Sequence, residues 1–297
     1  MREDVIVVGG SFAGLAAALY LARARRTVAV VDTGSPRNRF SRHAHGLLAQ
    51  DGRPPAAILA EARAQLASYP TVRFVHDAAL DAVMADGGFQ VTLAGGGQLG
   101  GRLLVLAFGV RDELPEIPGL AQRWGRSVLH CPYCHGYEFA GRRLGVLHAS
   151  PHSLQQVQLI AEWGPTTYFL NGTEVGDETV LAPLCARGIA VEPAAVLALH
   201  GSDDSLAGVE LVDGRTVAVD ALYVAPRTHL NSDLAATLGC ALDDGPWGPM
   251  VRTDALKATT VPGVFAAGDI TRSLHNVTFA AADGVTAGLA AHRALVF

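Results

Sequence analysis

The sequence of this 297-residue chain predicts an α/β fold built from two dinucleotide-binding-type domains. Three observations predict it. An apolar strand, a glycine-rich turn, a helix and a second strand follow one another in residues 4–32; a strand, a turn and a helix close the chain in 261–295; and a further α/β unit lies between them, with its first strand at 143–148. Strands that alternate with helices are typical of parallel sheets covered by helices.

The composition excludes several classes of protein. Apolar residues make up 49% of the chain and charged residues 17%, against roughly 25% charged in an average protein, so a folded core is expected and intrinsic disorder is not. The net charge of −5 and the lack of a basic block argue against a nucleic-acid partner. No apolar run reaches the ~20 residues of a membrane span and no leader is recognisable, which predicts a cytoplasmic protein with no membrane partner.

The first segment that carries chemistry is the turn at residues 9–14 (GGSFAG), between a strand and a helix. Glycines allow a tight turn and let the backbone approach a pyrophosphate, which lies at the N-terminus of the following helix. Asp32 ends the second strand, 18 residues after Gly14, where its carboxylate can accept hydrogen bonds from ribose hydroxyls. A glycine turn kept for packing alone is the alternative. The predicted dinucleotide contacts are Gly9, Ser11, Phe12, Ala13, Gly14 and Asp32.

The most informative segment is residues 131–135 (CPYCH). Cys131 and Cys134, three residues apart, fall on one face at a helix start, close enough to form a disulfide. A helix N-terminus favours the thiolate, which is the reactive form of cysteine, and His135 can exchange a proton near neutral pH. These three residues are the predicted catalytic groups.

Other interpretations of the cysteines are weaker. The spacing also matches c-type haem attachment, which is expected with export, and a zinc site needs a second pair of ligands. Cys185 and Cys240 lie far apart in the sequence, so we predict that they are buried apolar side chains and that the chain has no metal site. Buried structural thiols would not explain the paired spacing.

The order of these segments resembles that of low-molecular-weight thioredoxin reductases, and the resemblance covers nearly the whole chain. It rests on the glycine turn, the cysteine pair, the strand at 103–109 and the closing segment 261–269 (VPGVFAAGD). The resemblance implies FAD as the cofactor, a homodimer, and a discontinuous FAD-binding domain (1–112 and 245–297) with an inserted pyridine-nucleotide-type domain (113–244). Further FAD contacts implied in this way are Arg39, Ala107, Gly109, Gly268, Asp269, His275, Asn276 and Val277. His43, His45 and His130 are weaker candidates for the flavin surroundings.

The resemblance also assigns roles within the cysteine pair. It makes Cys134 the thiolate next to the flavin and Cys131 the cysteine that exchanges with substrate. The family usually has an aspartate directly after the second cysteine, whereas this chain has His135, which implies a different route for protons.

The inserted domain departs from the family where NADPH would bind. Residues 149–152 (ASPH) follow the strand at 143–148 and contain no glycine, so side chains would crowd a pyrophosphate. Residues 171–174 (NGTE), after the strand at 166–170, hold no arginine for a 2′-phosphate. The domain is predicted to keep its fold without the nucleotide. A divergent site that uses Ser150 and Ser153 is the alternative.

Because the NADPH motifs are missing, the chain most resembles the dithiol oxidases that close disulfides in gliotoxin and holomycin. That likeness implies a small dithiol or a thioredoxin-like protein as substrate, O2 as acceptor and hydrogen peroxide as product. Two alternatives stay open. One is a disulfide reductase supplied with electrons by ferredoxin or another protein donor, and the other is a non-catalytic flavin-binding redox sensor.

Overall fold

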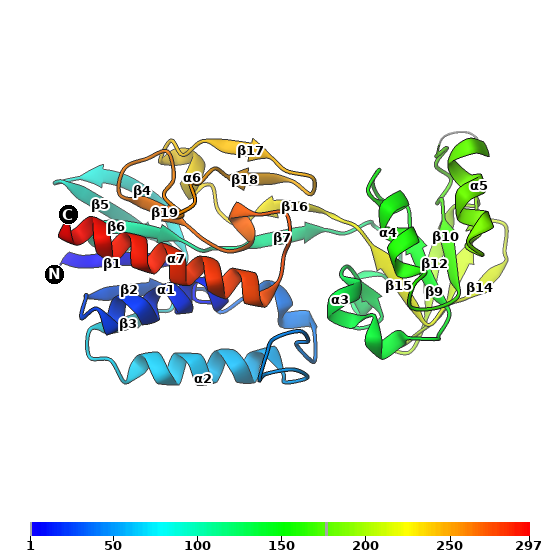
Figure 1. Cartoon of the computed structure of the whole chain (residues 1–297), viewed down its shortest axis with the longest axis horizontal. Coiled ribbons are helices and arrows are strands. Elements are labelled where there is room, and N and C mark those ends of the chain that lie inside the picture. The colour runs from blue at the N-terminus through cyan, green and yellow to red at the C-terminus, as the bar shows by residue number, and fades with distance from the viewer. Residues whose placement is uncertain (1, 176–177) are drawn as a thin grey trace. The chain divides into compact units, whose positions relative to one another are not determined.

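The computed structural model describes residues 2–175 and 178–297 and confirms the α/β fold (Figure 1). The described chain forms two compact units. The first unit comprises residues 1–39, 56–111 and 228–297, and the second comprises 40–55 and 112–227. Within the described ranges, no helix is both long and apolar enough to cross a membrane.

The first unit contains a seven-stranded sheet with helices packed on it. Its strands are β1 (Arg2–Val8), β2 (Val28–Val31), β3 (Val72–Val75), β4 (Ala79–Ala85), β5 (Gly88–Leu93), β6 (Gln98–Leu106) and β19 (Val264–Ala266). Its helices are α1 (Phe12–Arg23), α2 (Pro55–Ala67), α6 (Leu234–Thr237) and α7 (Val277–Val296), with short 3-10 turns η1 (Arg37–Phe40) and η4 (Asp269–Thr271). The small ribbon β17 (Leu242–Asp244) and β18 (Pro249–Val251) completes it.

The sheet of the first unit branches at β6. The strand order is β3-β2-β1-β6-β5-β4, and β1, β2, β3 and β6 run parallel. The N-terminal part of β6 pairs with antiparallel β5 and its C-terminal part with parallel β19. Because β1, β6 and β19 are parallel neighbours, the turns that follow them lie at the same edge of the sheet.

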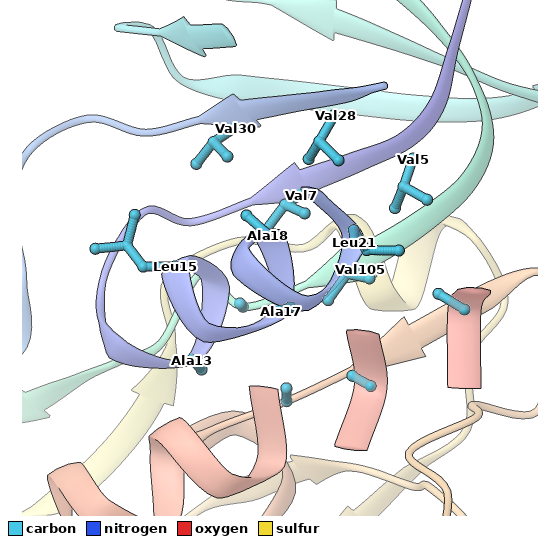
Figure 2. Close-up of a cluster of buried hydrophobic side chains, with 14 of the residues drawn as sticks. Val5, Val7, Ala13, Leu15, Ala17, Ala18, Leu21, Val28, Val30 and Val105 are labelled. Carbon is cyan, nitrogen blue, oxygen red and sulfur yellow. The ribbon is translucent and has the colours of Figure 1, made fainter. Parts of the chain in front are cut away.

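A core of small side chains holds α1 between the sheet and α7. Valines of β1, β2 and β6 point toward the alanine and leucine side chains of α1 (Figure 2). On the other side α7 approaches so closely that a Cβ on Gly284 would lie 2.0 Å from the carbonyl oxygen of Ala13, and one on Gly288 would lie 2.7 Å from that of Ala17. Glycines in α7 therefore fix the distance between the two helices.

The second unit contains a five-stranded parallel sheet and a small antiparallel one. The parallel sheet has the order β11-β10-β9-β15-β8, from β8 (Val128–Leu129), β9 (Leu144–Leu147), β10 (Thr166–Phe169), β11 (Ala190–Glu192) and β15 (Ala221–Val224). The antiparallel sheet comprises β12 (Val196–Gly201), β13 (Leu206–Leu211) and β14 (Thr216–Ala218). Its helices are α3 (Pro132–His135), α4 (Ser153–Ile160) and α5 (Glu178–Ala186), with 3-10 turns η2 (Ala121–Arg123) and η3 (Tyr137–Phe139).

The chain passes between the units along the strands β7 (Val110–Glu113) and β16 (Arg227–Leu230), which pair with each other. The return to the first unit lies at 227/228, whereas the sequence placed it at 244/245. It lies earlier because α6 and Cys240 are buried in the core of the first unit. Residues 40–55 pack with the second unit although the sequence placed them in the FAD-binding domain.

Candidate active site

The turn after β1 requires glycine at two of its positions, because any side chain there would collide with the backbone. Gly9 has a φ of +111°, and a Cβ there would lie 2.2 Å from the carbonyl oxygen of Ala107. A Cβ on Gly14 would lie 1.8 Å from the carbonyl oxygen of Gly9. Ser11 is the N-cap of α1, but its side chain makes no capping hydrogen bond. The backbone N–H groups of the first turn are thus the natural donors for a phosphate at this helix N-terminus.

Asp32 is held at the same turn by an arginine that the sequence did not single out. Its Oδ1 accepts a hydrogen bond from the Gly10 N–H at 3.0 Å, and its Oδ2 pairs with Nη2 of Arg63 in α2. The same Nη2 donates to the carbonyl oxygen of Gly10 at 2.6 Å. The carboxylate is therefore fixed at the end of β2, as a ribose-binding acid requires, and Arg63 balances its charge. Nothing in the local sequence distinguishes Arg63 from other helical arginines.

A second group of polar residues follows β19. Gly268 has a φ of +82°, and the carboxylate of Asp269 accepts from Nη1 of Arg37 at 3.0 Å. The same Nη1 lies 2.7 Å from Nδ1 of His275, and Nε2 of His275 lies 3.0 Å from the carbonyl oxygen of Arg272. A guanidinium only donates, so Nδ1 is the acceptor and Nε2 carries the proton. His275 is thereby held as one neutral tautomer.

The other residues of this region occupy defined places. Asn276 is the N-cap of α7, and its Oδ1 accepts from the Thr278 N–H at 2.7 Å. Val277 is the first residue of that helix. Arg39 lies in η1, and its Nη1 donates to the carbonyl oxygen of Pro36 at 3.0 Å.

The strand β6 brings two more predicted contacts to the same edge of the sheet. Ala107 is buried, and its N–H donates to the carbonyl oxygen of Val8 at 2.7 Å. Gly109 has a φ of +69°, and its carbonyl oxygen accepts from the N–H of Asn231. Phe108 packs against the core of the first unit.

A buried ion group that the sequence did not reveal supports the turn after β19. The carboxylate of Asp283 in α7 is buried and accepts from Nζ of Lys257 at 2.8 Å and from Arg272 at 2.8 Å through both Nε and Nη2. Arg272 also lies over the ring of Phe279, 4.7 Å from its centroid. A buried carboxylate with two cationic partners fixes the segments that it joins.

In the second unit, α3 presents the cysteine pair. Cys131 is the N-cap of this short helix, and its Sγ accepts a hydrogen bond from the Cys134 N–H at 3.2 Å. Both cysteines are partly buried, and their sulfurs are not linked to each other. Tyr133 packs edge-on against Trp163, with ring centroids 5.7 Å apart. A hydrogen bond to sulfur favours its ionised form, so the helix start supports a thiolate at Cys131.

His135 lies in a cluster with two histidines from the segment 40–55. Its ring is edge-on to that of His45 at 6.1 Å, and the His45 ring lies 6.2 Å from that of His43. Nε2 of His45 is 3.4 Å from a carboxylate oxygen of Glu138. Burial lowers the pKa of His135 to about 4; the charge of Glu138 opposes this shift, and His45 and His43 add to it. His135 is therefore neutral at pH 7.

In the loop between β9 and α4, a serine side chain occupies the backbone N–H groups that could otherwise bind a phosphate. Ser153 is buried, and its Oγ accepts from the N–H groups of Ala149 at 3.1 Å and Ser150 at 3.3 Å. These backbone donors are the ones that a phosphate at the start of α4 would need.

The prediction for the two remaining cysteines is half right. Cys240 is buried, and burial raises the pKa of its thiol. Cys185 is exposed, so the prediction that it is a buried apolar side chain is wrong. The reason is helical periodicity: in α5 the neighbouring Leu184 faces the core and Cys185 faces away. In the part of the chain that the structure describes, no group of three His, Cys, Asp or Glu residues could hold a metal ion.

One α/β unit carries a glycine turn suited to a dinucleotide, and the other carries a helix with the sequence Cys-x-x-Cys-His. Together these features define a two-domain thiol–disulfide oxidoreductase. The comparison with protein families agrees. The model described as pyridine nucleotide-disulphide oxidoreductase matches residues 3–164 and 165–284, so the chain belongs to this family and is an oxidoreductase. Members of the family that resemble thioredoxin reductase typically bind FAD.

Similar proteins support the thioredoxin-reductase-like branch. The chain is 33% identical over 302 residues to a protein named thioredoxin reductase sirT from Leptosphaeria maculans, covering 96% of this chain and 92% of that one. The crystal structure of an oxidoreductase from Agrobacterium tumefaciens is 45% identical, with a TM-score of 0.95 over 100% of this chain and 99% of that one. The crystal structure of HlmI is 40% identical, with a TM-score of 0.93 over 99% and 93%.

Proposed function

We propose that the protein is an FAD-dependent dithiol oxidase that closes a disulfide in its substrate through Cys131 and Cys134. The observation that carries this proposal is the closed loop after β9. Ser153 occupies the backbone donors of Ala149 and Ser150, and the loop has no glycine, so the usual route for electrons from NADPH has no phosphate site there. A dithiol substrate is then the source of electrons.

The residues of the first unit fit FAD. The turn at 9–14 and the N-terminus of α1 would hold the pyrophosphate, and Asp32, fixed by the Gly10 N–H, would accept from the ribose. Asp269 and the neutral His275 would meet the ribityl chain and the ring. When bound, FAD supplies a two-electron acceptor for the reduced cysteine pair, and O2 takes those electrons and two protons to give hydrogen peroxide.

The cysteine pair performs the exchange with substrate. One substrate thiolate attacks the sulfur of Cys131, which breaks the Cys131–Cys134 bond and forms a mixed disulfide. The second substrate thiol then attacks the substrate sulfur of that bond, which releases Cys131 and leaves the substrate as a disulfide. Two electrons and two protons now lie on the protein, and Cys134, the released thiolate, is the cysteine assigned to the flavin.

His135 handles the protons of these steps. Because its pKa is about 4, the imidazole is neutral at pH 7 and offers an acceptor nitrogen to an incoming thiol, but it is a weak base toward that thiol and can only relay the proton. The same low pKa means that it gives the proton up readily, so it is ready again for the second thiol.

The test is anaerobic spectroscopy of the flavin-loaded protein, with Cys134→Ser as the variant. We expect a small dithiol, but not NADPH, to bleach the flavin, and admitted air to restore the colour with formation of peroxide. Cys134→Ser should keep the flavin and lose turnover, whereas Cys185→Ser, which removes an exposed cysteine of α5, should behave as the wild type. Bleaching by NADPH, or turnover in Cys134→Ser, would refute the proposal. Bleaching by dithiol with very slow recovery in air would favour the protein-fed reductase.

A further inference from the structure

Gln156 is a buried polar side chain of α4 that bonds to the residue directly before the redox pair. Its exposed fraction is 9%, and its Nε2 donates to the carbonyl oxygen of His130 at 2.9 Å. Its Oε1 is buried and has no hydrogen-bond partner in the described part of the chain. Burying an amide with one unpaired atom is unfavourable, so packing alone does not account for a glutamine at this position.

The bond from Gln156 holds the peptide that leads into α3. The paired register of β8 with β15 ends at Leu129, one residue before His130. The carbonyl oxygen of His130 and the nitrogen of Cys131 belong to one planar peptide, so a bond to that oxygen restrains the whole plane. The side chain of His130 is held as well, since its Nδ1 lies 3.1 Å from the carbonyl oxygen of Val224 in β15.

The helix on the other side of Cys131 is held by Trp163, which follows α4. The ring of Tyr133 packs edge-on against the indole at 5.7 Å, and a Cβ on Gly136 would lie 2.7 Å from the indole Nε1. With the peptide before it and the helix after it both held, Cys131 keeps a φ of −103° and a ψ of 118°, the extended backbone typical of an N-cap. In this conformation its Sγ accepts from the Cys134 N–H at 3.2 Å.

We propose that Gln156 is a positioning residue of the redox pair: it holds the peptide before Cys131 so that the Cys131 sulfur stays within hydrogen-bond reach of the Cys134 N–H when the pair is reduced. This inference rests on the redox role of the pair proposed above. A hydrogen bond to a thiolate is charge-assisted, so keeping the donor in place favours the ionised, reactive sulfur. The helix α4 thus serves the cysteine pair rather than a nucleotide.

Gln156→Met keeps the length of the side chain and removes the donor, and Gln158→Met is the matched control. Gln158 lies on the same helix, but its Nε2 donates to the carbonyl oxygen of Leu154 within α4. The flavin-loaded protein is reduced with dithiothreitol without air and freed of the reagent, and alkylation of Cys131 and Cys134 by iodoacetamide is followed against pH by mass spectrometry. In Gln156→Met we expect the pH of half-maximal reactivity of Cys131 to rise by about half a unit to one unit, which is an about three- to tenfold smaller thiolate fraction at lower pH. Gln158→Met should match the wild type.

Other groups around the pair also titrate, so the variants are compared with the wild type at each pH. They come from the segments about α3 and are His43, His45, Asp51, His130, Cys134, His135, Glu138, His148 and Tyr223. None of them is changed in Gln156→Met or Gln158→Met.

Hydrogen exchange of the Cys134 amide, measured by NMR, gives a second readout, because this N–H is the donor to the sulfur. In Gln156→Met the Cys134 amide should exchange faster than in the wild type, while the amides of β9 keep their rates. An equal acceleration in β9 would show a general loss of stability and would overturn the specific role. If Gln156→Met does not fold, Gln156→Leu, which also lacks the donor, takes its place.

The outcomes separate this inference from the proposed function. If the wild type forms no Cys131–Cys134 disulfide in air, the proposed function fails whatever the variants do. If the disulfide forms and turns over but Gln156→Met leaves both the midpoint of Cys131 and the exchange of the Cys134 amide unchanged, only the role of Gln156 is overturned. The role is also overturned if both cysteines change in rate by the same factor at every pH, because that is a change of access and not the loss of a hydrogen bond.

Discussion

Acid should destabilise the folded protein through His135. Burial lowers the pKa of this imidazole from 6.5 to about 4, so between these values the unfolded chain binds a proton that the folded chain does not. The folded state is therefore fully favoured above about pH 6.5 and loses free energy as the pH falls toward 4. At about 1.36 kcal/mol for each pKa unit, the loss from this one side chain is at most about 3 kcal/mol.

The measurement is urea unfolding of wild type and His135→Asn at pH 7 and at pH 4. The wild type should lose up to about 3 kcal/mol more of its free energy of unfolding than His135→Asn over this interval. His200→Gln, which removes an exposed histidine of β12, controls for the general effect of losing an imidazole. An equal loss in wild type and His135→Asn, or an NMR titration of the folded protein that places the His135 midpoint near 6.5, would refute the argument from burial.

Two further substitutions test other parts of the structure. Glu138→Gln removes the negative charge that raises the pKa of His135, so the NMR midpoint of His135 should fall below that of the wild type; an unchanged midpoint would show that the carboxylate does not act on the ring. Gly284→Ala places a methyl group 2.0 Å from the carbonyl oxygen of Ala13, and backbone must move to admit it, so we expect a loss of about 1–3 kcal/mol in urea unfolding. Gly97→Ala, whose Cβ would make an ordinary contact at 3.6 Å, is the control, and equal stabilities of the two variants would contradict the close packing of α1 on α7.

The sequence by itself determined the fold class and the two chemical motifs. The turn at 9–14 was recognisable in part because Gly14 is required locally, by the carbonyl oxygen of Gly9, although Gly9 itself is required by Ala107, far along the chain. The pair Cys131 and Cys134 was recognisable for the same reason, since their hydrogen bond closes within one helical turn. Local spacing brings such groups close together. The absence of glycine from residues 149–152 could also be recognised from the sequence alone, without knowledge of the fold.

Only the tertiary structure decided which distant side chains complete these motifs. Arg39 stays a predicted FAD contact, whereas the pairing of Arg37 with Asp269, 232 residues away, had no signal in the sequence. His45 was a candidate for the flavin surroundings, and the fold places it with His135 in the second unit. A hydrogen-bond or ion-pair partner that comes from a distant strand or loop depends on how whole elements pack against each other. Hydrophobic periodicity predicts which face of an element is buried, but it does not predict which polar atoms of other elements contact that face.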